Sequence, residues 1–264
     1  MSGTAFARAI VRAVPKTLDA GITSADLGTP DYEKARDQHA RYVEALEKCG
    51  LEVTALAADE RYPDSVFIED TAVMTGRCAI VARPGAQRRR GEIFEVEEAL
   101  SGLYKNVERI VDPGTLDGGD VLQVGDHFYI GLTRRTNREG AGQLAEILRG
   151  YGFGASLVGL RRFLHLKTGV AYLGGYDLVV AGELVEMEEL GAFDRIVVPP
   201  EEEYGANCIR VNDRVLVAAG HERTAERIVE RGYEVIELEM SEFRKVDGGL
   251  SCLSLRLPEA DLPG

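Results

Sequence analysis

A strand, a helix and a second strand follow one another several times along the chain, and this recurrence restricts the fold more than any other feature. Alternating or short apolar runs mark the strands, and apolar residues at helical spacing lie between them. The starts of the middle units lie several dozen residues apart, a period typical of propellers or solenoids. The five predicted units comprise the strand, helix and strand at residues 6–14, 31–49 and 51–56; 77–83, 92–103 and 107–111; 127–131, 139–149 and 155–160; 176–181, 183–190 and 195–198; and 214–219, 224–231 and 234–237.

This pattern predicts one α/β domain over residues 1–264, a five-bladed α/β-propeller built as a pseudo-five-fold ring of strand-helix-strand units. A closed ring fits because each unit can bury its apolar face only against its neighbours. Hairpins, such as the one expected to turn at Thr75-Gly76, should link one unit to the next. The sequence has no Gly-x-Gly-x-x-Gly after a predicted strand, which disfavours a dinucleotide-binding fold.

Charge and cysteine usage exclude several functional classes. Acidic residues outnumber basic ones by 44 to 31, giving a formal charge of −13, which argues against nucleic acid or an anionic membrane as the partner. The four cysteines are scattered without paired spacing, so neither a disulfide framework nor a zinc ribbon is expected. The first apolar run, at residues 6–14, contains two arginines and lacks the core of a signal peptide. We therefore expect a cytoplasmic protein.

The segment at residues 245–255, Lys-Val-Asp-Gly-Gly-Leu-Ser-Cys-Leu-Ser-Leu, holds the strongest candidate for a reactive group. Its thiol, Cys252, lies between a Gly-Gly turn and an apolar run, where the backbone can approach a ligand closely. A lone cysteine is usually a small buried hydrophobe. Here, however, His165 and the carboxylates at residues 64–70 and 117–120 supply the other parts of a cysteine, histidine and carboxylate site.

These motifs together carry a resemblance to a known family. Asp-Ser-Val-Phe-Ile-Glu-Asp at residues 64–70, Leu-Asp-Gly-Gly-Asp at 116–120, His-Leu-Lys-Thr-Gly at 165–169 and Asp-Gly-Gly-Leu-Ser-Cys at 247–252 resemble the dimethylarginine dimethylaminohydrolases. That family belongs to the guanidine-modifying group of the pentein superfamily, and the resemblance extends to Leu257. It implies hydrolysis of N-omega-methylated arginines to citrulline and dimethylamine or methylamine. Lys167 stands where arginine and agmatine deiminases carry an aspartate, which argues against simple deimination.

The resemblance implies catalytic roles for Cys252, His165 and Asp117. A guanidinium carbon is a poor electrophile, so a site must fix the cation and offer a polarisable nucleophile. We expect Asp70 and Asp117 to bind the planar cation and orient its carbon toward Cys252. His165 would protonate the departing amine and then activate water, by way of a covalent S-alkylthiouronium. No metal and no cofactor are expected, because the thiolate supplies the nucleophile.

The resemblance also implies contacts at the amino-acid end of the substrate. Arg89 and Arg135 would bind the carboxylate, with Arg88 and Arg90 as alternatives to Arg89. Asp64 would bind the ammonium group together with the backbone carbonyls of Ile22 and Val246, under a lid at residues 21–28. Each of the remaining acids has two interpretations. Glu69 either binds substrate or orients its neighbours, and Asp247 either binds substrate or begins the Gly-Gly turn. Asp120 either caps a turn or supports the site.

Two alternatives stay open from the sequence. The first is related chemistry on another guanidino or ureido compound, such as arginine deimination, amidino transfer or citrulline hydrolysis. The second is a non-catalytic pentein that binds a macromolecule, which the joint presence of thiol, imidazole and carboxylates disfavours. The expected partner is a small molecule, a methylated arginine, and the oligomeric state is open between a monomer and a homodimer.

Overall fold

The computed structural model describes residues 5–258, within which the strands form five sheets of three strands each. In every sheet the middle strand pairs antiparallel with an inner strand and parallel with an outer strand. Written as inner, middle and outer strand, the sheets are β15 (Leu255–Pro258), β1 (Phe6–Arg12), β2 (Glu52–Leu56); β3 (Ala72–Met74), β4 (Ala79–Val81), β5 (Val107–Arg109); β6 (Val121–Val124), β7 (His127–Leu132), β8 (Gly154–Gly159); β9 (Val170–Gly174), β10 (Asp177–Val180), β11 (Asp194–Val197); and β12 (Ile209–Val211), β13 (Arg214–Ala218), β14 (Glu234–Leu238).

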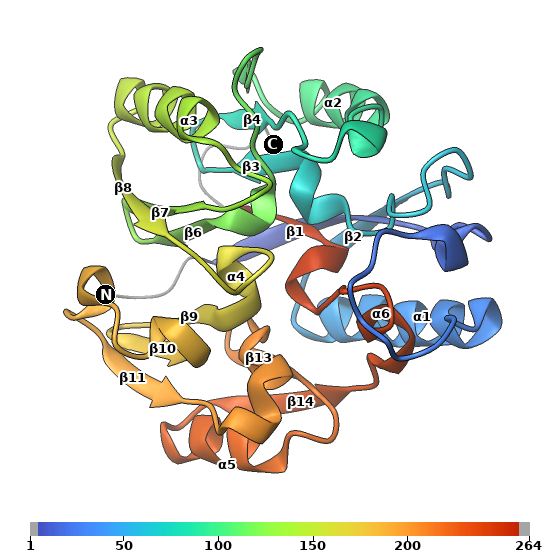
Figure 1. Cartoon of the computed structure of the whole chain (residues 1–264), viewed down its shortest axis with the longest axis vertical. Helices are drawn as coiled ribbons and strands as arrows, with labels where there is room; N and C mark the ends of the chain where they lie inside the picture. Colours follow the sequence, from blue (N-terminus) through green and yellow to red (C-terminus); the bar gives the residue numbers. More distant parts are fainter. Residues whose placement is uncertain (1–4, 259–264) are drawn as a thin grey trace.

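Helices join the middle strand of a sheet to its outer strand, because a parallel pair needs a crossover connection. Figure 1 shows α1, α2, α3 and α5 around the periphery of the ring. The crossover of the fourth sheet lacks the helix predicted at residues 183–190. Two 3-10 turns, η5 (Gly182–Leu184) and η6 (Glu188–Leu190), replace it, since Met187 between them has an extended backbone. The helices are α1 (Tyr32–Lys48), α2 (Ile93–Ser101), α3 (Arg138–Gly150), α4 (Leu166–Gly169), α5 (Glu222–Glu230) and α6 (Ser241–Arg244).

Local sequence explains where the crossover helices begin and which face they bury. The side chain of Asp31 accepts a hydrogen bond from the backbone N–H of Lys34 and so caps α1. Apolar residues at positions three and four apart on α1, including Ala35, Tyr42 and Leu46, are buried in a core shared with β1. Asn137 caps α3 in the same way, through the N–H of Gly140. Within residues 5–258, none of these helices is both long and apolar enough to span a bilayer.

The inner strands face the centre of the ring, where β9 contacts β6 and β12, and β15 contacts β3. A cavity of about 150 Å³ lies among them, lined by side chains from all five inner strands. The hairpin predicted to turn at Thr75-Gly76 is present and, like those of three other sheets, joins the inner and middle strands of one sheet. The sequence pattern does not reveal the inner strand β12, because its three residues are too few for a visible alternation.

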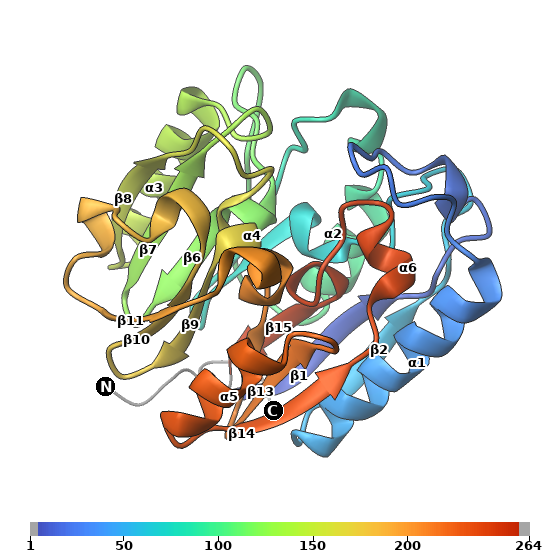
Figure 2. The same cartoon turned by 60° about the horizontal axis from the view of Figure 1, so that its bottom comes forward.

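The ring is closed by strands from opposite ends of the chain. Strand β15 pairs antiparallel with β1, with Leu255 opposite Ile10 and Leu257 opposite Arg8. Figure 2 shows these two strands side by side. The side chains of Ile10, Leu255 and Leu257 are buried together in one core cluster. Closure therefore removes a free sheet edge and buries apolar side chains in the same step.

A short helical turn precedes every inner strand. These turns are η2 (Ile68–Thr71) before β3, η4 (Gly118–Asp120) before β6, α4 before β9, η7 (Pro200–Ala206) before β12 and η8 (Ser251–Leu253) before β15. Neighbouring turns contact one another: η2 meets η4 and η8, and α4 meets η4 and η7. The pseudo-five-fold symmetry thus brings five equivalent turns together at one end of the inner strands.

Leu257→Ala should destabilise the protein by about 2–5 kcal/mol, because the substitution leaves a cavity where β15 closes the ring. The side chain of Leu257 is 0% exposed. Urea unfolding should show a lower midpoint at an unchanged slope. Phe94→Ala on α2 is the control, since Phe94 is 68% exposed and its loss should change stability by about 0.5 kcal/mol or less. Equal effects of the two substitutions would contradict the importance of closure.

Candidate active site

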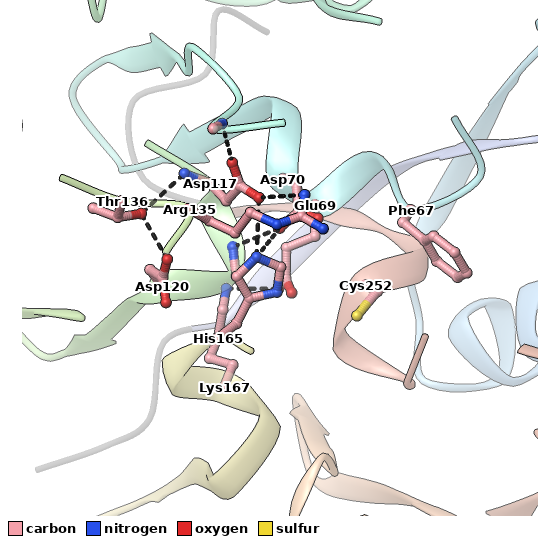
Figure 3. A network of polar contacts seen from close by, with 12 residues as sticks. Phe67, Glu69, Asp70, Asp117, Asp120, Arg135, Thr136, His165, Lys167 and Cys252 are labelled. Atoms are coloured by element: carbon pink, nitrogen blue, oxygen red, sulfur yellow. Dashed lines mark hydrogen bonds and ion pairs between the residues drawn. The ribbon is translucent and has the colours of Figure 1, made fainter. Parts of the chain in front are cut away.

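Four of the five turns bring the predicted chemical groups together. Asp70 lies in η2, Asp117 is the N-cap of η4, His165 is the N-cap of α4 and Cys252 lies in η8. In Figure 3 the thiol of Cys252 points toward the side of the network that holds His165. The structure therefore gathers residues that are far apart in the sequence at one end of the ring.

His165 is held by two carboxylates. Its Nε2 lies 3.0 Å from Oδ2 of Asp117 and 3.8 Å from Oδ1 of Asp70. Burial alone would lower the pKa of His165, but the charge of Asp70, the hydrogen bond to Asp117 and the charge of Asp120 outweigh it and raise the pKa to about 9. The imidazole is therefore protonated at neutral pH and carries a proton that it can donate.

Asp70 stays ionised despite its burial. Its Oδ1 accepts a hydrogen bond from the N–H of Gly119 at 3.0 Å, and its Oδ2 from Nη1 of Arg89 at 2.6 Å. Burial would raise the pKa of Asp70, but His165, Arg89 and the Gly119 N–H hold it well below its usual range. Gly119 is required here, since a Cβ at this position would lie 2.8 Å from Asp70 Oδ1.

Arg89 lies behind Asp70, and its three nitrogen atoms all contact groups of the protein. Nε and Nη2 bind the carboxylate of Glu92, and Nη2 also donates to the carbonyl of Phe67 at 3.0 Å. Burial raises the pKa of Glu92 to about 7, although Arg89 opposes the shift. Arg88 is exposed, and Arg90 donates to the carbonyl of Pro84. The role of Arg89 as a carboxylate ligand thus stays a prediction, and its observed contact orients Asp70.

Arg135 is placed differently from Arg89. Its Nη1 lies 3.6 Å from Oδ2 of Asp117, beyond hydrogen-bond distance, and is buried without a hydrogen-bond partner among the described residues. Oδ1 of Asp117 meanwhile accepts a hydrogen bond from the N–H of Gly85 at 2.8 Å. An unpaired buried guanidinium N–H is costly unless a ligand satisfies it. Of the two predicted carboxylate ligands, Arg135 is the one with a free donor.

Asp120 fixes the turn that carries His165. Its Oδ1 accepts a hydrogen bond from the N–H of Leu166 at 3.0 Å, the first residue of α4. Its Oδ2 accepts hydrogen bonds from the hydroxyls of Thr133 and Thr136. Burial raises the pKa of Asp120 to about 6. These contacts fit the reading of Asp120 as a supporting residue.

Glu69 connects the turn of Cys252 to the turn of His165. Oε1 accepts from Nζ of Lys167 at 2.6 Å and from Nη2 of Arg256 at 3.2 Å, and Oε2 accepts from the hydroxyl of Ser251 at 2.8 Å. All of its contacts are therefore with protein groups. Lys167, which stands where the deiminases carry an aspartate, is one partner of this buried carboxylate.

Cys252 is half-buried and is a free thiol. Burial of the sulfur raises the pKa of Cys252 to about 12, and the carboxylates of Glu69 and Asp70 act in the same direction. The hydroxyl of Ser251 lies 4.0 Å from the sulfur. The thiol is consequently neutral at physiological pH, and a cation beside the nearby carboxylates would lower its pKa.

The residues predicted for the ammonium group also lie together. Oδ1 of Asp64 accepts a hydrogen bond from the N–H of Ile22 at 2.9 Å. A Cβ at Gly21 would lie 3.2 Å from this oxygen and 3.3 Å from Cγ1 of Val246. Asp247, with φ of 56°, accepts hydrogen bonds from the N–H and the hydroxyl of Ser24. The segment predicted as a lid is thus attached to the loop that precedes Cys252.

One group of side chains has the spacing of a metal site. Ligand atoms of Asp70, Asp117 and His165 all lie within 4.8 Å of one another. The guanidinium of Arg89 contacts Asp70 directly, and Arg135 lies beside Asp117. Adjacent positive charge disfavours a second cation of high charge density, whereas planar carboxylate pairs suit a delocalised cation.

Sequence reasoning missed several residues that hold the site, namely Glu92, Thr133, Thr136, Asn207 and Ser251. Asn207 follows η7 and lies two residues before β12, just as Asp70 lies two residues before β3. An alignment of the five units on their inner strands would have indicated it. The three-residue inner strand beside it hides that alignment.

Comparisons with known proteins identify the family. A model described as N,N dimethylarginine dimethylhydrolase, eukaryotic, matches residues 29–188. The N(G),N(G)-dimethylarginine dimethylaminohydrolase of Pseudomonas aeruginosa is 52% identical over 252 residues, which make up 95% of this chain and 99% of that protein. This chain belongs to the dimethylarginine dimethylaminohydrolase family. The resemblance read from the motifs is confirmed.

Solved structures of the dimethylarginine dimethylaminohydrolase family share the fold. The Pseudomonas aeruginosa enzyme, as a cysteine-to-serine mutant complexed with citrulline, superposes with a TM-score of 0.95 at 51% identity, covering 96% of this chain and 100% of that one. A histidine-to-glycine variant of a dimethylarginine dimethylaminohydrolase, as an adduct with S-methyl-L-thiocitrulline, gives 0.94 at 51% identity with the same coverage. The predicted five-bladed pentein propeller is therefore confirmed.

Alkylation of Cys252 by iodoacetamide should be slow near neutral pH and should keep rising beyond about pH 9, because only the thiolate reacts and burial suppresses it. Asp70→Asn should accelerate alkylation several-fold at about pH 8, since it removes a charge that raises the pKa of the thiol. Mass spectrometry of the labelled peptide measures both rates. A plateau below about pH 8, as for an activated thiolate, would contradict this electrostatic picture.

Proposed function

We propose that this protein hydrolyses N-omega-methylated arginines to L-citrulline and dimethylamine or methylamine through a covalent intermediate on Cys252. The observation that carries the proposal is the gathering of thiol, protonated imidazole and two buried carboxylates on turns of one ring. Family membership supports it, because a relative at 51% identity was solved with citrulline. The proposed catalytic unit is the single domain formed by the five sheets.

Electrostatics supports a substrate-assisted start of the reaction. In the free protein the thiol of Cys252 holds its proton, partly because Asp70 is negatively charged. A bound guanidinium would neutralise Asp70 and Asp117 through charge-assisted hydrogen bonds. The same cation would lower the pKa of the thiol and favour the thiolate. In this scheme the nucleophile forms only when its electrophile is present.

The proposed steps balance in protons and bonds. Once the guanidinium is bound, the thiol of Cys252 loses its proton to solvent. The thiolate then attacks the guanidinium carbon and forms a C–S bond, which gives a tetrahedral adduct. His165 donates its proton to the substituted nitrogen, the C–N bond breaks and the methylamine leaves. The neutral imidazole then removes a proton from water, which attacks the S-alkylthiouronium carbon. This attack gives a second tetrahedral adduct, whose C–S bond breaks as its hydroxyl proton passes to the sulfur, which releases citrulline and restores the thiol.

The far end of the substrate is proposed to bind beside the segment at residues 21–28. Arg135 is proposed to donate from its unpaired Nη1 to the α-carboxylate of the substrate. Arg89 is proposed as the second ligand of the same carboxylate. Asp64, the carbonyls of Ile22 and Val246, and nearby Asp247 are proposed for the α-ammonium side. Glu69 is proposed to act through Lys167 and Ser251.

Location and assembly belong to the same proposal. The free thiols of the four cysteines support a reducing compartment such as the cytoplasm. A homodimer stays a prediction, and a methylated arginine is the proposed small-molecule partner.

Cys252→Ser should abolish release of dimethylamine from asymmetric dimethylarginine while leaving the melting temperature nearly unchanged, because oxygen is close to sulfur in size but far less nucleophilic. Cys49→Ala, at the C-terminal end of α1, is the control and should keep turnover. Citrulline and dimethylamine are quantified after incubation with substrate. Faster ammonia release from arginine than dimethylamine release from asymmetric dimethylarginine would overturn the substrate assignment.

His165→Ala should lower kcat by roughly 10²-fold or more, the usual contribution of general acid-base catalysis. For the unmodified protein, kcat/KM should rise with pH up to about 9, because thiol and imidazole both hold protons there and one must leave. Steady-state kinetics across this range checks both statements. A kcat/KM that falls between about pH 7 and 9 would contradict the statement that one of these two protons must leave before attack.

A further inference from the structure

The fifth turn contributes a residue to the site whose role is unassigned. In four sheets, the turn before the inner strand carries Asp70, Asp117, His165 or Cys252. In the fifth, η7 is followed by Asn207, which is 4% exposed. Its side chain forms hydrogen bonds with Ser251 in η8 and with Lys167 in α4, so it lies between two of the neighbouring turns.

Asn207 joins the turn of the nucleophile to the turn of the acid. Its Oδ1 accepts a hydrogen bond from the N–H of Ser251 at 2.9 Å. Its Nδ2 donates to the carbonyl of Lys167 at 3.1 Å and to the hydroxyl of Ser251 at 3.2 Å. Ser251 directly precedes Cys252, and Lys167 lies on α4, of which His165 is the N-cap. One amide therefore bridges the two backbones that carry thiol and imidazole.

The neighbouring Gly-Gly turn is shaped around this amide. A Cβ at Gly249 would lie 2.6 Å from Cγ and Oδ1 of Asn207, so only glycine lets the amide reach Ser251. A second bridge runs parallel to the first, because Glu69 binds both the hydroxyl of Ser251 and Nζ of Lys167. The bridge through Glu69 uses side chains at both ends. The bridge through Asn207 holds the backbone itself.

We propose that Asn207 is a positioning residue that fixes the Cys252 turn relative to the His165 turn for attack and proton transfer. This inference rests on the proposed function, because it assigns Asn207 to that same reaction. The amide makes no hydrogen bond to Asp70, Asp117 or Arg135 among the described contacts. Its loss should therefore slow the chemical step while leaving substrate binding nearly intact, as expected when geometry and not affinity changes.

Asn207→Ala tests the proposal, and Asn212→Gly is the matched control, because it removes another asparagine that bridges distant segments. Asn212 lies at the other end of β12 and also joins distant segments, through Phe6 and the carbonyl of Cys49. Its φ of 56° makes glycine the substitution that removes these bonds without strain. Asn207→Ala should lower kcat by about 10- to 100-fold with KM within about threefold. Asn212→Gly should lower the melting temperature and leave kcat unchanged. Equal kcat values for the two variants would overturn the proposal.

A second readout needs no substrate. Loosening the Cys252 turn exposes the thiol, so iodoacetamide should alkylate Asn207→Ala several-fold faster than the unmodified protein at about pH 8, at a temperature where both are folded. Faster alkylation together with slower turnover, in a variant that is still folded, would show that the Cys252 turn has moved and that the protein has not simply unfolded. If the unmodified protein released no dimethylamine, the proposed function would fail, and the alkylation rates alone would decide the role of Asn207. Unchanged alkylation would then overturn it.

Asn207→Asp covers the case in which the alanine variant does not fold. Aspartate keeps the size of the side chain and the acceptor for the N–H of Ser251, but its carboxylate cannot donate to the carbonyl of Lys167. Turnover should again fall with KM nearly unchanged. A kcat equal to that of the unmodified protein would show that the bond to Lys167 has no role in positioning.

Discussion

The pairing of β15 with β1 is the constraint on which the site depends. It joins the two ends of the described chain in one sheet and closes the ring. The turn η8 leads directly into β15, so the register of this strand sets the position of Cys252. A slip of one residue would turn Leu255 and Leu257 out of the core, which makes other registers costly. Packing of apolar side chains thus determines the position of the Cys252 thiol.

Within the closed ring, charge decides which groups hold protons. The carboxylates of Asp70 and Asp117 surround an imidazole that is protonated at neutral pH, whereas the thiol opposite keeps its own proton. Many cysteine nucleophiles are stored as thiolate beside an imidazolium. Here burial of the sulfur, reinforced by the negative charges of Glu69 and Asp70, prevents that arrangement. In the proposed reaction, a bound guanidinium would bring the positive charge that lowers the pKa of the thiol.

Much of this architecture could be predicted from the sequence. Alternating apolar runs and helical spacing predicted the middle and outer strands of all five sheets and four of the crossover helices, and α1 and α3 begin at capping residues that the sequence displays. Cys252, His165 and the acids at residues 64–70 and 117–120 were recognisable because each lies in a glycine-rich or turn-forming motif. The inner strand β12 is harder to predict, because its three residues have too little pattern to distinguish it from a loop.

The supporting contacts could not be predicted, because they join residues far apart in the sequence. Arg89 was expected to point at substrate from its position in a turn, yet its guanidinium is bound by Glu92 and Asp70. Asn207 lies in none of the recognised motifs, and its partners Lys167 and Ser251 are distant in sequence and come from α4 and η8. Lys167 was recognisable because it departs from the deiminase pattern. Its partner Glu69 was not, because it lies 98 positions earlier in the sequence.

The late position of η8 has a consequence during synthesis on the ribosome. The acids and the imidazole emerge first, on sheets that can already pack against one another, while the first sheet still lacks its inner strand. The sulfur joins them only after residue 252 has left the exit tunnel and β15 has docked. The full set of predicted site groups therefore comes together only when β15 pairs with β1 and the ring closes.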